Sequence, residues 1–231
     1  MDLKSSESEK IQKKSGYHHG NLRNSIIEAV AQLIRERRTL DFQLKDVAAL
    51  VGTSQPAIYK HFDSKRALLV ETAVAGYQLQ KQFRDHAFQH SDPSPLSKAF
   101  AMGYAYVHFS HECPGYFVLM KSLETDEILS SKRYQTQRDE TLSLIRNLIT
   151  QCIKEGLFID TDLDLAMTTL QATAFGLAHL YLSDQMEVIA RSLHKDKDLT
   201  SRVFIQAMGS MLSPKGLDHL EKTDQNPFIT Q

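Results

Sequence analysis

The sequence has little cysteine, no long apolar run and no alternation of apolar and polar residues, and each absence excludes a class of protein. Two cysteines, Cys113 and Cys152, are too few for a disulfide framework and match no metal-ligand spacing, which fits free thiols in a reducing cytosol. No stretch reaches the roughly 18 apolar residues that a membrane-spanning helix needs, and residues 1–16 lack the apolar segment of a signal peptide. We therefore expect a soluble, cytoplasmic protein without a membrane partner.

The absence of alternating strand patterns and of Asn-Gly hairpin turns predicts an all-α fold. Apolar residues instead recur at intervals of three and four, as on one face of a helix. The 231 residues, 42% of them hydrophobic, suffice for one large domain or for a small and a medium one. Helices are expected over residues 21–38, 44–51, 54–61, 64–90, 100–111, 116–122, 126–154, 162–182 and 199–212.

Charge is spread unevenly along the chain, although the net charge is only −1. Residues 1–66 contain 12 Lys and Arg against 8 Asp and Glu, a net charge of +4, and the remaining residues carry 15 basic and 20 acidic groups, a net charge of −5. A basic front and an acidic rear suit a nucleic-acid-binding head on a body that avoids DNA, although a difference of this size is also common by chance.

The most informative segment is 42–69, in which two short helical patterns flank a glycine and a third pattern follows at once. Gly52 closes the first pattern, because glycine readily takes left-handed dihedrals at a helix end. Pro56 is tolerated in the second, because the first turn of a helix has no intrahelical N–H bond to lose. This order of elements predicts a helix-turn-helix, whose second helix enters the major groove of DNA.

The second helix of this segment carries side chains that can read a base pair. Gln55 can pair bidentately with adenine, and Pro56 or Ala57 can touch the methyl group of thymine. Ile58 and Phe62 are apolar and are expected to anchor the helix to its partners. The polar side of the helix is therefore predicted to face DNA.

The same segment resembles the TetR family of transcription regulators. The residues that match in register are Phe42, Leu44, Asp46, Val47, Ala48, Gly52, Ser54, Tyr59, His61, Phe62, Ser64, Lys65, Leu68 and Leu69. The leading Tyr17-His18-His19-Gly20-Asn21-Leu22-Arg23 is similar to one subgroup of that family. The resemblance implies a sequence-specific regulator of double-stranded DNA in which Tyr59, His61 and Lys65 contact phosphates.

The residues and the resemblance together give one set of DNA-binding candidates. Gln43 stands where the family usually has a capping Ser or Thr, and glutamine caps poorly, so we assign it no contact. Two alternatives stay open: Tyr59 can belong to the core, and helix-turn-helix units also occur in recombinases and in adaptors that bind proteins. The candidates are Lys45, Thr53, Ser54, Gln55, Pro56, Ala57, Tyr59, Lys60, His61 and Lys65.

The resemblance continues more weakly into the body of the chain. The effector domain of that subgroup usually has a tryptophan and a histidine at two positions where this chain has Gln171 and Phe175. This difference removes any ligand chemistry that depends on those two side chains. The residues that resemble the effector domain of the same subgroup are Tyr104, Tyr106, Val107, Phe109, Glu112, Pro114, Met120, Gly176, Leu177, Ala178 and Leu180.

By this resemblance the body binds a small effector of unknown identity and forms a homodimer. Effector binding then favours a spacing of the two heads that no longer matches the operator. The last two helices are expected to pair across the two-fold axis through Leu170, Ala174, Leu177, Tyr181, Val203, Ala207 and Met211, although these faces also suit an internal core. Inward aromatic, Met or His residues give the ligand candidates Tyr104, His108, Phe117, Met120, Phe175 and His179, although such a stripe also suits plain core.

The sequence thus predicts an all-α protein with an N-terminal three-helix helix-turn-helix DNA-binding domain and a larger C-terminal helical domain for ligand binding and dimerisation. Its expected parts are a disordered arm at 1–16, the DNA-binding head at 17–66, the body at 67–213 and a flexible tail at 214–231.

We expect a repressor, with no catalytic residue, metal site or cofactor. The alternatives are an activator, a regulator that responds to a protein or to oxidation of Cys113, a metal site at His108 and His111, and a helical enzyme that uses His108, His111 and His179.

Overall fold

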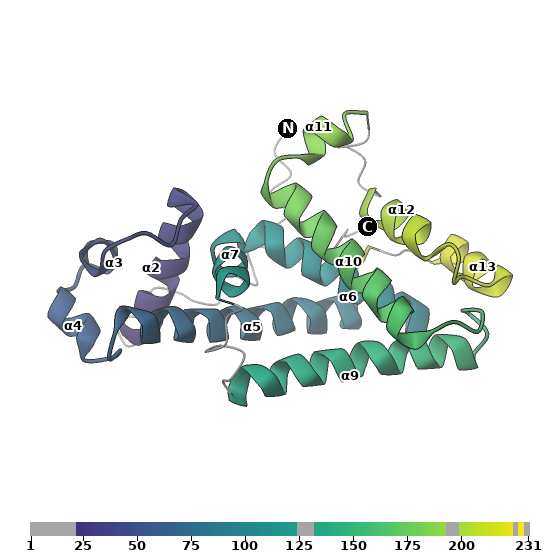
Figure 1. Ribbon diagram of the computed structural model, residues 1–231, viewed down its shortest axis with the longest axis horizontal. Helices are drawn as coiled ribbons and strands as arrows, with labels where there is room; N and C mark the ends of the chain where they lie inside the picture. The colour runs from purple at the N-terminus through teal and green to yellow at the C-terminus, as the bar shows by residue number, and fades with distance from the viewer. Residues whose placement is uncertain (1–21, 124–131, 193–198, 224–225, 229–231) are drawn as a thin grey trace. The chain divides into compact units, whose positions relative to one another are not determined.

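A computed structural model describes residues 22–123, 132–192, 199–223 and 226–228 (Figure 1). Within these ranges the chain is helical, with a single isolated bridge between Phe158 and Leu212, which confirms the all-α prediction. The expected arm at 1–16 and the motif at 17–21 lie outside them. The helices are α2 (Leu22–Arg37), α3 (Leu44–Val51), α4 (Gln55–Tyr59), α5 (Lys65–Gln89), α6 (Pro95–Glu112), α7 (Pro114–Ser122), α9 (Lys132–Lys154), α10 (Leu163–Leu182), α11 (Met186–Ile189), α12 (Leu199–Met208) and α13 (Pro214–Lys222).

The chain divides into two compact units, which are described separately. Unit 1 comprises the residues up to Ala75 together with Glu112–Leu123, and unit 2 comprises Gly76–His111 and the residues from Glu124 onward. Unit 1 therefore includes α7, which the sequence analysis had assigned to the body at 67–213.

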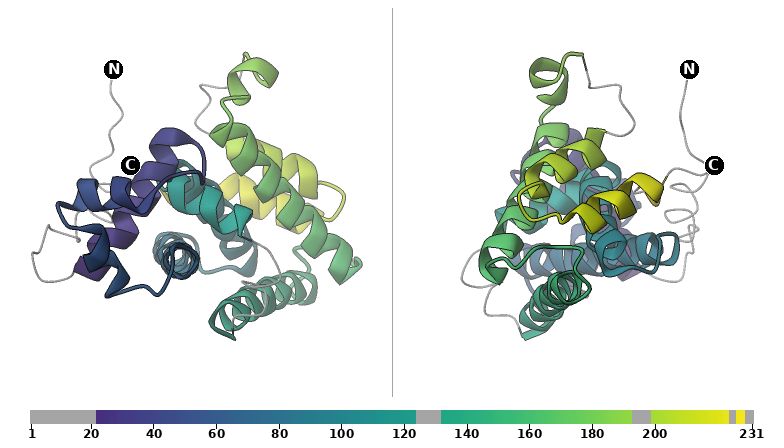
Figure 2. Two further views of the ribbon diagram at one scale, coloured as in Figure 1. Left: turned by 60° about the vertical axis from the view of Figure 1, so that its left-hand side comes forward. Right: turned by 90° about the vertical axis from the view of Figure 1, so that its right-hand side faces the viewer.

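In unit 1, α2 packs against both α7 and α3 (Figure 2). The face of α2 that it presents to them is apolar, with Ile26, Val30 and Ile34 fully buried. The backbone of α7 lies so close to α2 that a Cβ at Gly115 would overlap the carbonyl oxygen of Ala31. Glycine is thus required at this position by packing, and α2 and α7 form one layer of the unit.

In unit 2, α10 packs against both α9 and α12 (Figure 1). The core between the helices contains the fully buried Phe100, Ile149 and Phe204, with Leu170 of α10 also buried. Ile149 therefore lies on the apolar face of α9 that packs into this core.

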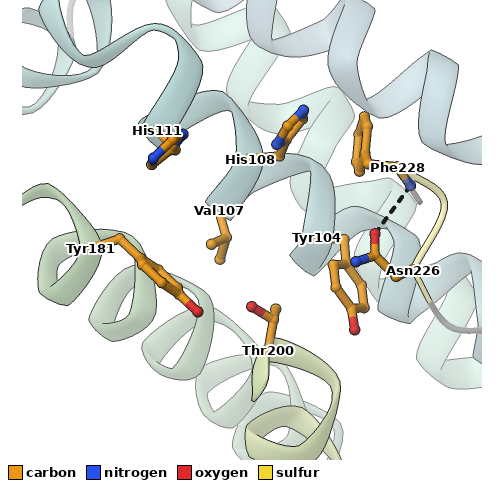
Figure 3. A pocket seen from close by; sticks show the side chains of 8 residues that line it. All are labelled: Tyr104, Val107, His108, His111, Tyr181, Thr200, Asn226 and Phe228. Atoms are coloured by element: carbon orange, nitrogen blue, oxygen red, sulfur yellow. Dashed lines mark hydrogen bonds between the residues drawn. The ribbon is translucent and has the colours of Figure 1, made fainter. Parts of the chain in front are cut away.

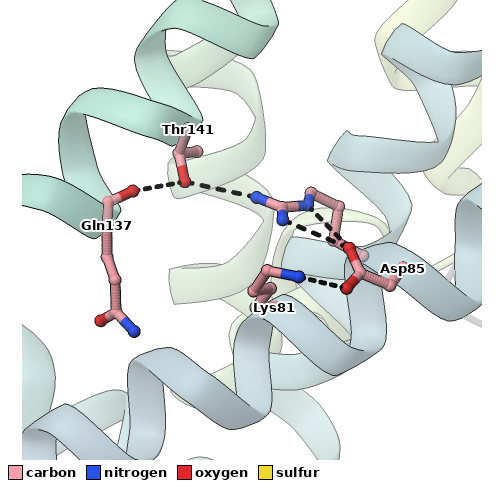
Figure 4. Close-up of polar contacts among 5 residues, drawn as sticks. Lys81, Asp85, Gln137 and Thr141 are labelled. Atoms are coloured by element: carbon pink, nitrogen blue, oxygen red, sulfur yellow. Dashed lines mark hydrogen bonds and ion pairs between the residues drawn. The ribbon is translucent and has the colours of Figure 1, made fainter.

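A polar network joins the second half of α5 to α9 within unit 2 (Figure 4). The Arg84 guanidinium donates to the Asp85 carboxylate at 3.2 Å and to Oγ1 of Thr141 on α9 at 3.4 Å. Thr141 in turn donates to the backbone oxygen of Gln137 at 2.9 Å, and Lys81 pairs with Asp85 at 2.6 Å. Such partly exposed contacts contribute little stability each, so they mainly fix the orientation of α9 on α5.

The C-terminal segment corrects one expectation, because the predicted flexible tail at 214–231 contains the helix α13. Ser213 caps this helix, and its backbone N–H donates to the carbonyl oxygen of Leu157 at 3.0 Å. Leu220 is buried in the core of unit 2. A helix of nine residues is marginal by itself, and these long-range contacts stabilise it.

Candidate nucleic-acid interface and ligand cavity

The turn between α3 and α4 has the geometry that the glycine predicted. Gly52 takes a left-handed conformation, with φ of 71°, and its N–H faces the carbonyls that end α3. Thr53 continues the turn by donating its N–H to the Ala48 carbonyl at 2.9 Å. Ser54 then caps α4, and its hydroxyl accepts the N–H of Ala57 at 3.3 Å. The sequence-predicted helix-turn-helix is therefore present.

The short helix α4 exposes one side and buries the other. Ile58 and Phe62 are 1% and 3% exposed, which confirms their predicted role as anchors. Tyr59 is 48% exposed, so the alternative that it belongs to the core is wrong. Gln55 and Lys60 are also exposed. A helix held in this way presents its polar side chains to a partner without further rearrangement.

The other candidates of the head lie around this helix. Lys45 on α3 is exposed, as are Ser54, Pro56 and His61. Thr53 and Ala57 are half-buried, and their backbone N–H groups bond within the turn.

The start of α3 is organised by an acidic side chain. Asp46 accepts a hydrogen bond from the Arg37 guanidinium at 2.8 Å and another from the N–H of Gln43 at 3.1 Å. These two bonds hold the pKa of the Asp46 carboxyl below its ordinary value of 3.8. Asp46 is the third residue of α3 and accepts the N–H of Gln43, as the acidic residue of a capping box does.

Lys65, a predicted phosphate contact, also makes contacts within the protein. Its ammonium group donates to the carbonyl oxygen of Phe42 at 2.5 Å and to that of Leu40 at 3.3 Å. It also lies 4.2 Å from the centroid of the Phe42 ring, within range of a cation–π interaction. Lys65 therefore connects the loop before α3 to the start of α5. The sequence motif that contains Lys65 does not reveal this contact, because its partners are distant in sequence.

A second contact within the head is made by Arg23, which connects α2 to α5. Its guanidinium forms an ion pair with Glu71 at 2.5 Å and lies 5.1 Å from the Phe62 ring centroid. Arg23 closes the heptapeptide motif that resembled one subgroup, and within unit 1 it acts by holding the helices of the head together.

A cavity of about 280 Å³ lies among helices of unit 2 (Figure 3). Two of the six ligand candidates, Tyr104 and His108, line it. They lie on one face of α6 with His111, at spacings of four and three. The other lining residues, none of which was among the predicted ligand candidates, are Val107, Tyr181, Thr200, Asn226 and Phe228.

Residues 226–228 form one wall of this cavity. The Asn226 side chain accepts the N–H of Phe228 at 3.1 Å. The Phe228 ring lies 4.2 Å from the His108 ring and is stacked on His86 at 5.5 Å. A wall supplied by the far end of the chain carries no local sequence signal, so periodicity did not find it.

The other four ligand candidates lie elsewhere, and we correct their placement. Phe117 and Met120 are buried on α7, which belongs to unit 1. Phe175 is 46% exposed and His179 is exposed, both on the outer face of α10. The helix buries its Leu177 instead. Residue type alone does not tell which face of an apolar helix points inward.

The structure does not bring together the residues of the two alternative sites, an enzyme site and a metal site. His179 lies outside the cavity that His108 and His111 line, so the three histidines proposed for an enzyme do not meet there. Over the described ranges, no three His, Cys, Asp or Glu side chains come together as metal ligands would.

The two cysteines are poorly placed to sense oxidants. Cys113 is 5% exposed and Cys152 is 0% exposed. Burial, with a contribution from the Glu155 carboxylate, raises the pKa of Cys152 to about 12, so this thiol stays protonated and unreactive.

A capped helix-turn-helix with an exposed polar recognition helix defines a helix-turn-helix DNA-binding protein. Residues 26–72 match the bacterial regulatory proteins of the TetR family, and residues 99–202 match the tetracyclin repressor-like C-terminal domain. The chain belongs to the TetR family and is a DNA-binding transcriptional regulator. The family's members are regulators, in agreement with the prediction that the chain is not an enzyme.

The individual relatives have low sequence identity to this chain. An uncharacterised helix-turn-helix-type regulator of Bacillus subtilis, YobS, is 25% identical over 134 residues, and the match spans 57% of this chain and 65% of that relative. The ketosteroid transcriptional regulator KstR2 of Mycobacterium tuberculosis has a similar fold, with a TM-score of 0.63 at 15% identity over 85% of this chain and 97% of the other. The TetR family transcriptional regulator PfmR of Thermus thermophilus gives a TM-score of 0.57 at 23% identity, covering 77% and 97% of the two chains.

None of the helices in the described ranges is both long and apolar enough to span a membrane.

Proposed function

We propose that this regulator is a ligand-responsive repressor that binds a pseudo-palindromic operator as a homodimer through residues 54–61, in the cytoplasm. The observation that carries the proposal is the short helix α4, anchored by buried Ile58 and exposing Gln55 and Tyr59. In this proposal Gln55 reads an adenine, and Pro56 or Ala57 contacts a thymine methyl group.

Contacts to the DNA backbone position the helix in the groove and carry no sequence information directly. We assign these contacts to residues in and around α4, namely Lys45, Thr53, Ser54, Tyr59, Lys60 and His61. Lys65 is assigned a second role besides any phosphate contact, because its ammonium group already holds two backbone carbonyls of the preceding loop.

The dimer is proposed to form through the outer face of α10. Leu165 and Phe175 are 62% and 46% exposed on this helix, although both are apolar. The exposed Ala172 and Gly176 lie on the same face and allow two helices to approach closely. The expected interface residues Leu170 and Leu177 instead belong to the core of unit 2, so the proposed interface is turned toward the opposite face. Two copies are needed because a pseudo-palindromic operator presents two half-sites.

Ligand response is proposed to arise in unit 2, where the cavity of about 280 Å³ provides a binding site. A ligand that binds better to one arrangement of the two heads shifts the population toward it and releases the operator. The alternative is an activator, or a regulator that responds to a protein. A redox response is disfavoured because both cysteines are buried.

The experiment that tests this proposal is selection of bound sequences from a random duplex pool at physiological salt. Enrichment of an inverted repeat is expected, with half-sites about 34–36 Å apart or a multiple of that distance. The Gln55→Ala variant should relax preference at one base position in each half-site, at a cost of about 1–3 kcal/mol. Enrichment of an unrepeated site would refute the dimer, and an unchanged preference in Gln55→Ala would refute the assigned reading residue.

A further inference from the structure

The cavity of unit 2 is lined by a set of side chains with a definite chemistry. Six of its eight lining residues carry a hydroxyl, an imidazole or an amide group. None of the described residues that line it is acidic, and none is lysine or arginine. Buried polar sites bind best the group that completes their hydrogen bonds. A ligand with hydrogen-bond acceptors is therefore favoured over an ammonium ion, which would find no carboxylate there.

Thr200 identifies where the polar end of a ligand binds. This residue is 8% exposed and its side chain lines the cavity. The Thr200 and Tyr181 hydroxyls point toward each other across the cavity, with His111 above them (Figure 3). These groups can together donate hydrogen bonds to a carboxylate or carbonyl oxygen.

The opposite part of the cavity is flat and aromatic. The Phe228 ring contacts the His108 ring at 4.2 Å between centroids, and Tyr104 lies beside them. Aromatic side chains at this separation pack well against a planar ring. The volume of about 280 Å³ falls just below the range of about 300–1,000 Å³ that is typical of pockets for drug-sized ligands, so the ligand is small.

We propose that the cavity binds a single-ring aromatic acid, with its acid group at Thr200 and Tyr181 and its ring against Phe228. This assignment rests on the proposed ligand-responsive function and names the chemical class of the effector. Because residues 226–228 form one wall, the C-terminal segment is part of the ligand site, beyond the residues 99–202 that match the family domain.

The test is calorimetric titration of the full chain with benzoate, benzylamine and octanoate, one at a time at the same ionic strength. Benzoate should bind saturably, in about the millimolar range expected of so small a ligand. Benzylamine has the same ring as benzoate but the opposite charge. Octanoate has the same charge as benzoate but no ring. Stronger binding of either one, or no binding of benzoate, would overturn the proposal.

A matched pair of variants locates the bound benzoate. Thr200→Val removes the hydroxyl with little change of shape and should weaken benzoate about tenfold or more, since hydrogen bonds to charged groups are strong. Thr150→Val removes a hydroxyl on α9 that donates to the Arg146 carbonyl and does not line the cavity, and it should leave the affinity unchanged. Equal affinities in the two variants would place benzoate outside this site and refute the assignment.

Operator selection with the same preparation separates the two proposals. A chain that enriches an inverted repeat yet prefers octanoate to benzoate overturns the aromatic-acid assignment and retains the regulator. A chain that binds benzoate through Thr200 but enriches no sequence supports the assignment and overturns the proposed repressor.

Discussion

Lys65 offers a direct test of how the head is held together, because its charge lies against the protein's own backbone. The ammonium group donates to the carbonyl oxygens of Phe42 and Leu40 at 2.5 and 3.3 Å, and it lies 4.2 Å from the Phe42 ring. The change Lys65→Met keeps most of the aliphatic chain and removes the charge. It thus separates the hydrogen bonds of Lys65 from its packing.

The contacts of the Lys65 ammonium group set the loss of stability that Lys65→Met should cause. A hydrogen bond from a charged donor contributes about 1.5–3 kcal/mol. Lys65 is only half-buried, so water partly replaces what is lost, and the longer bond to Leu40 is weaker. We expect Lys65→Met to lower the free energy of unfolding by about 1–3 kcal/mol, measured by urea denaturation.

Lys60→Met is the matched control, because Lys60 is exposed at the C-terminal end of α4, on the side that we propose faces DNA. This variant should change stability by less than about 0.5 kcal/mol. It should weaken DNA binding similarly for all sequences and reduce the salt dependence by about one counterion. If Lys65→Met matched Lys60→Met in both assays, the loop-fastening role of Lys65 would be wrong and a simple phosphate contact would explain it.

Three further changes test other parts of the fold. Gly115→Val should lower stability by about 1–3 kcal/mol in urea denaturation, because its Cβ would overlap the Ala31 carbonyl; an unchanged midpoint would contradict the close packing of α2 and α7. Leu220→Ala should cost about 2–5 kcal/mol by the same measurement, since Leu220 is buried in the core, whereas a flexible tail would tolerate it without loss. The pKa of Asp46 is lower in the folded protein than its ordinary value of 3.8, so the carboxylate stabilises the fold above that pH and stops doing so as the pH falls through the folded pKa. Asp46→Asn should therefore reduce stability at pH 7 and flatten its decline below about pH 4; an identical acid profile for the two proteins would refute the pairing with Arg37.

The helix-turn-helix was predictable because its signals are local. Gly52 ends α3 in a left-handed conformation, and Ser54 caps α4 three residues before the N–H that it accepts. Ile58 and Phe62 are buried as their spacing indicated. Each of these features depends on neighbours within about one helical turn, so a sequence pattern is sufficient to find it.

The orientation of α10 was not predictable in the same way. The helix is apolar on several sides, and its sequence allows either face to turn inward. Packing against α9 and α12 buries Leu170 and Leu177 and leaves Phe175 exposed. Because burial is decided by which helices lie alongside, two ligand candidates on this helix proved to be outside the cavity.

By itself, the sequence determined the all-α class, most helix positions and the polar face of the recognition helix, since these follow from backbone propensity, caps and hydrophobic period. Only the tertiary structure decided that Lys65 bonds to the loop before α3, that α13 is folded and that Phe228 faces His108. These contacts join residues separated by 23 or more positions along the chain, and the free energy that selects them comes from packing and hydrogen bonding that no local pattern encodes.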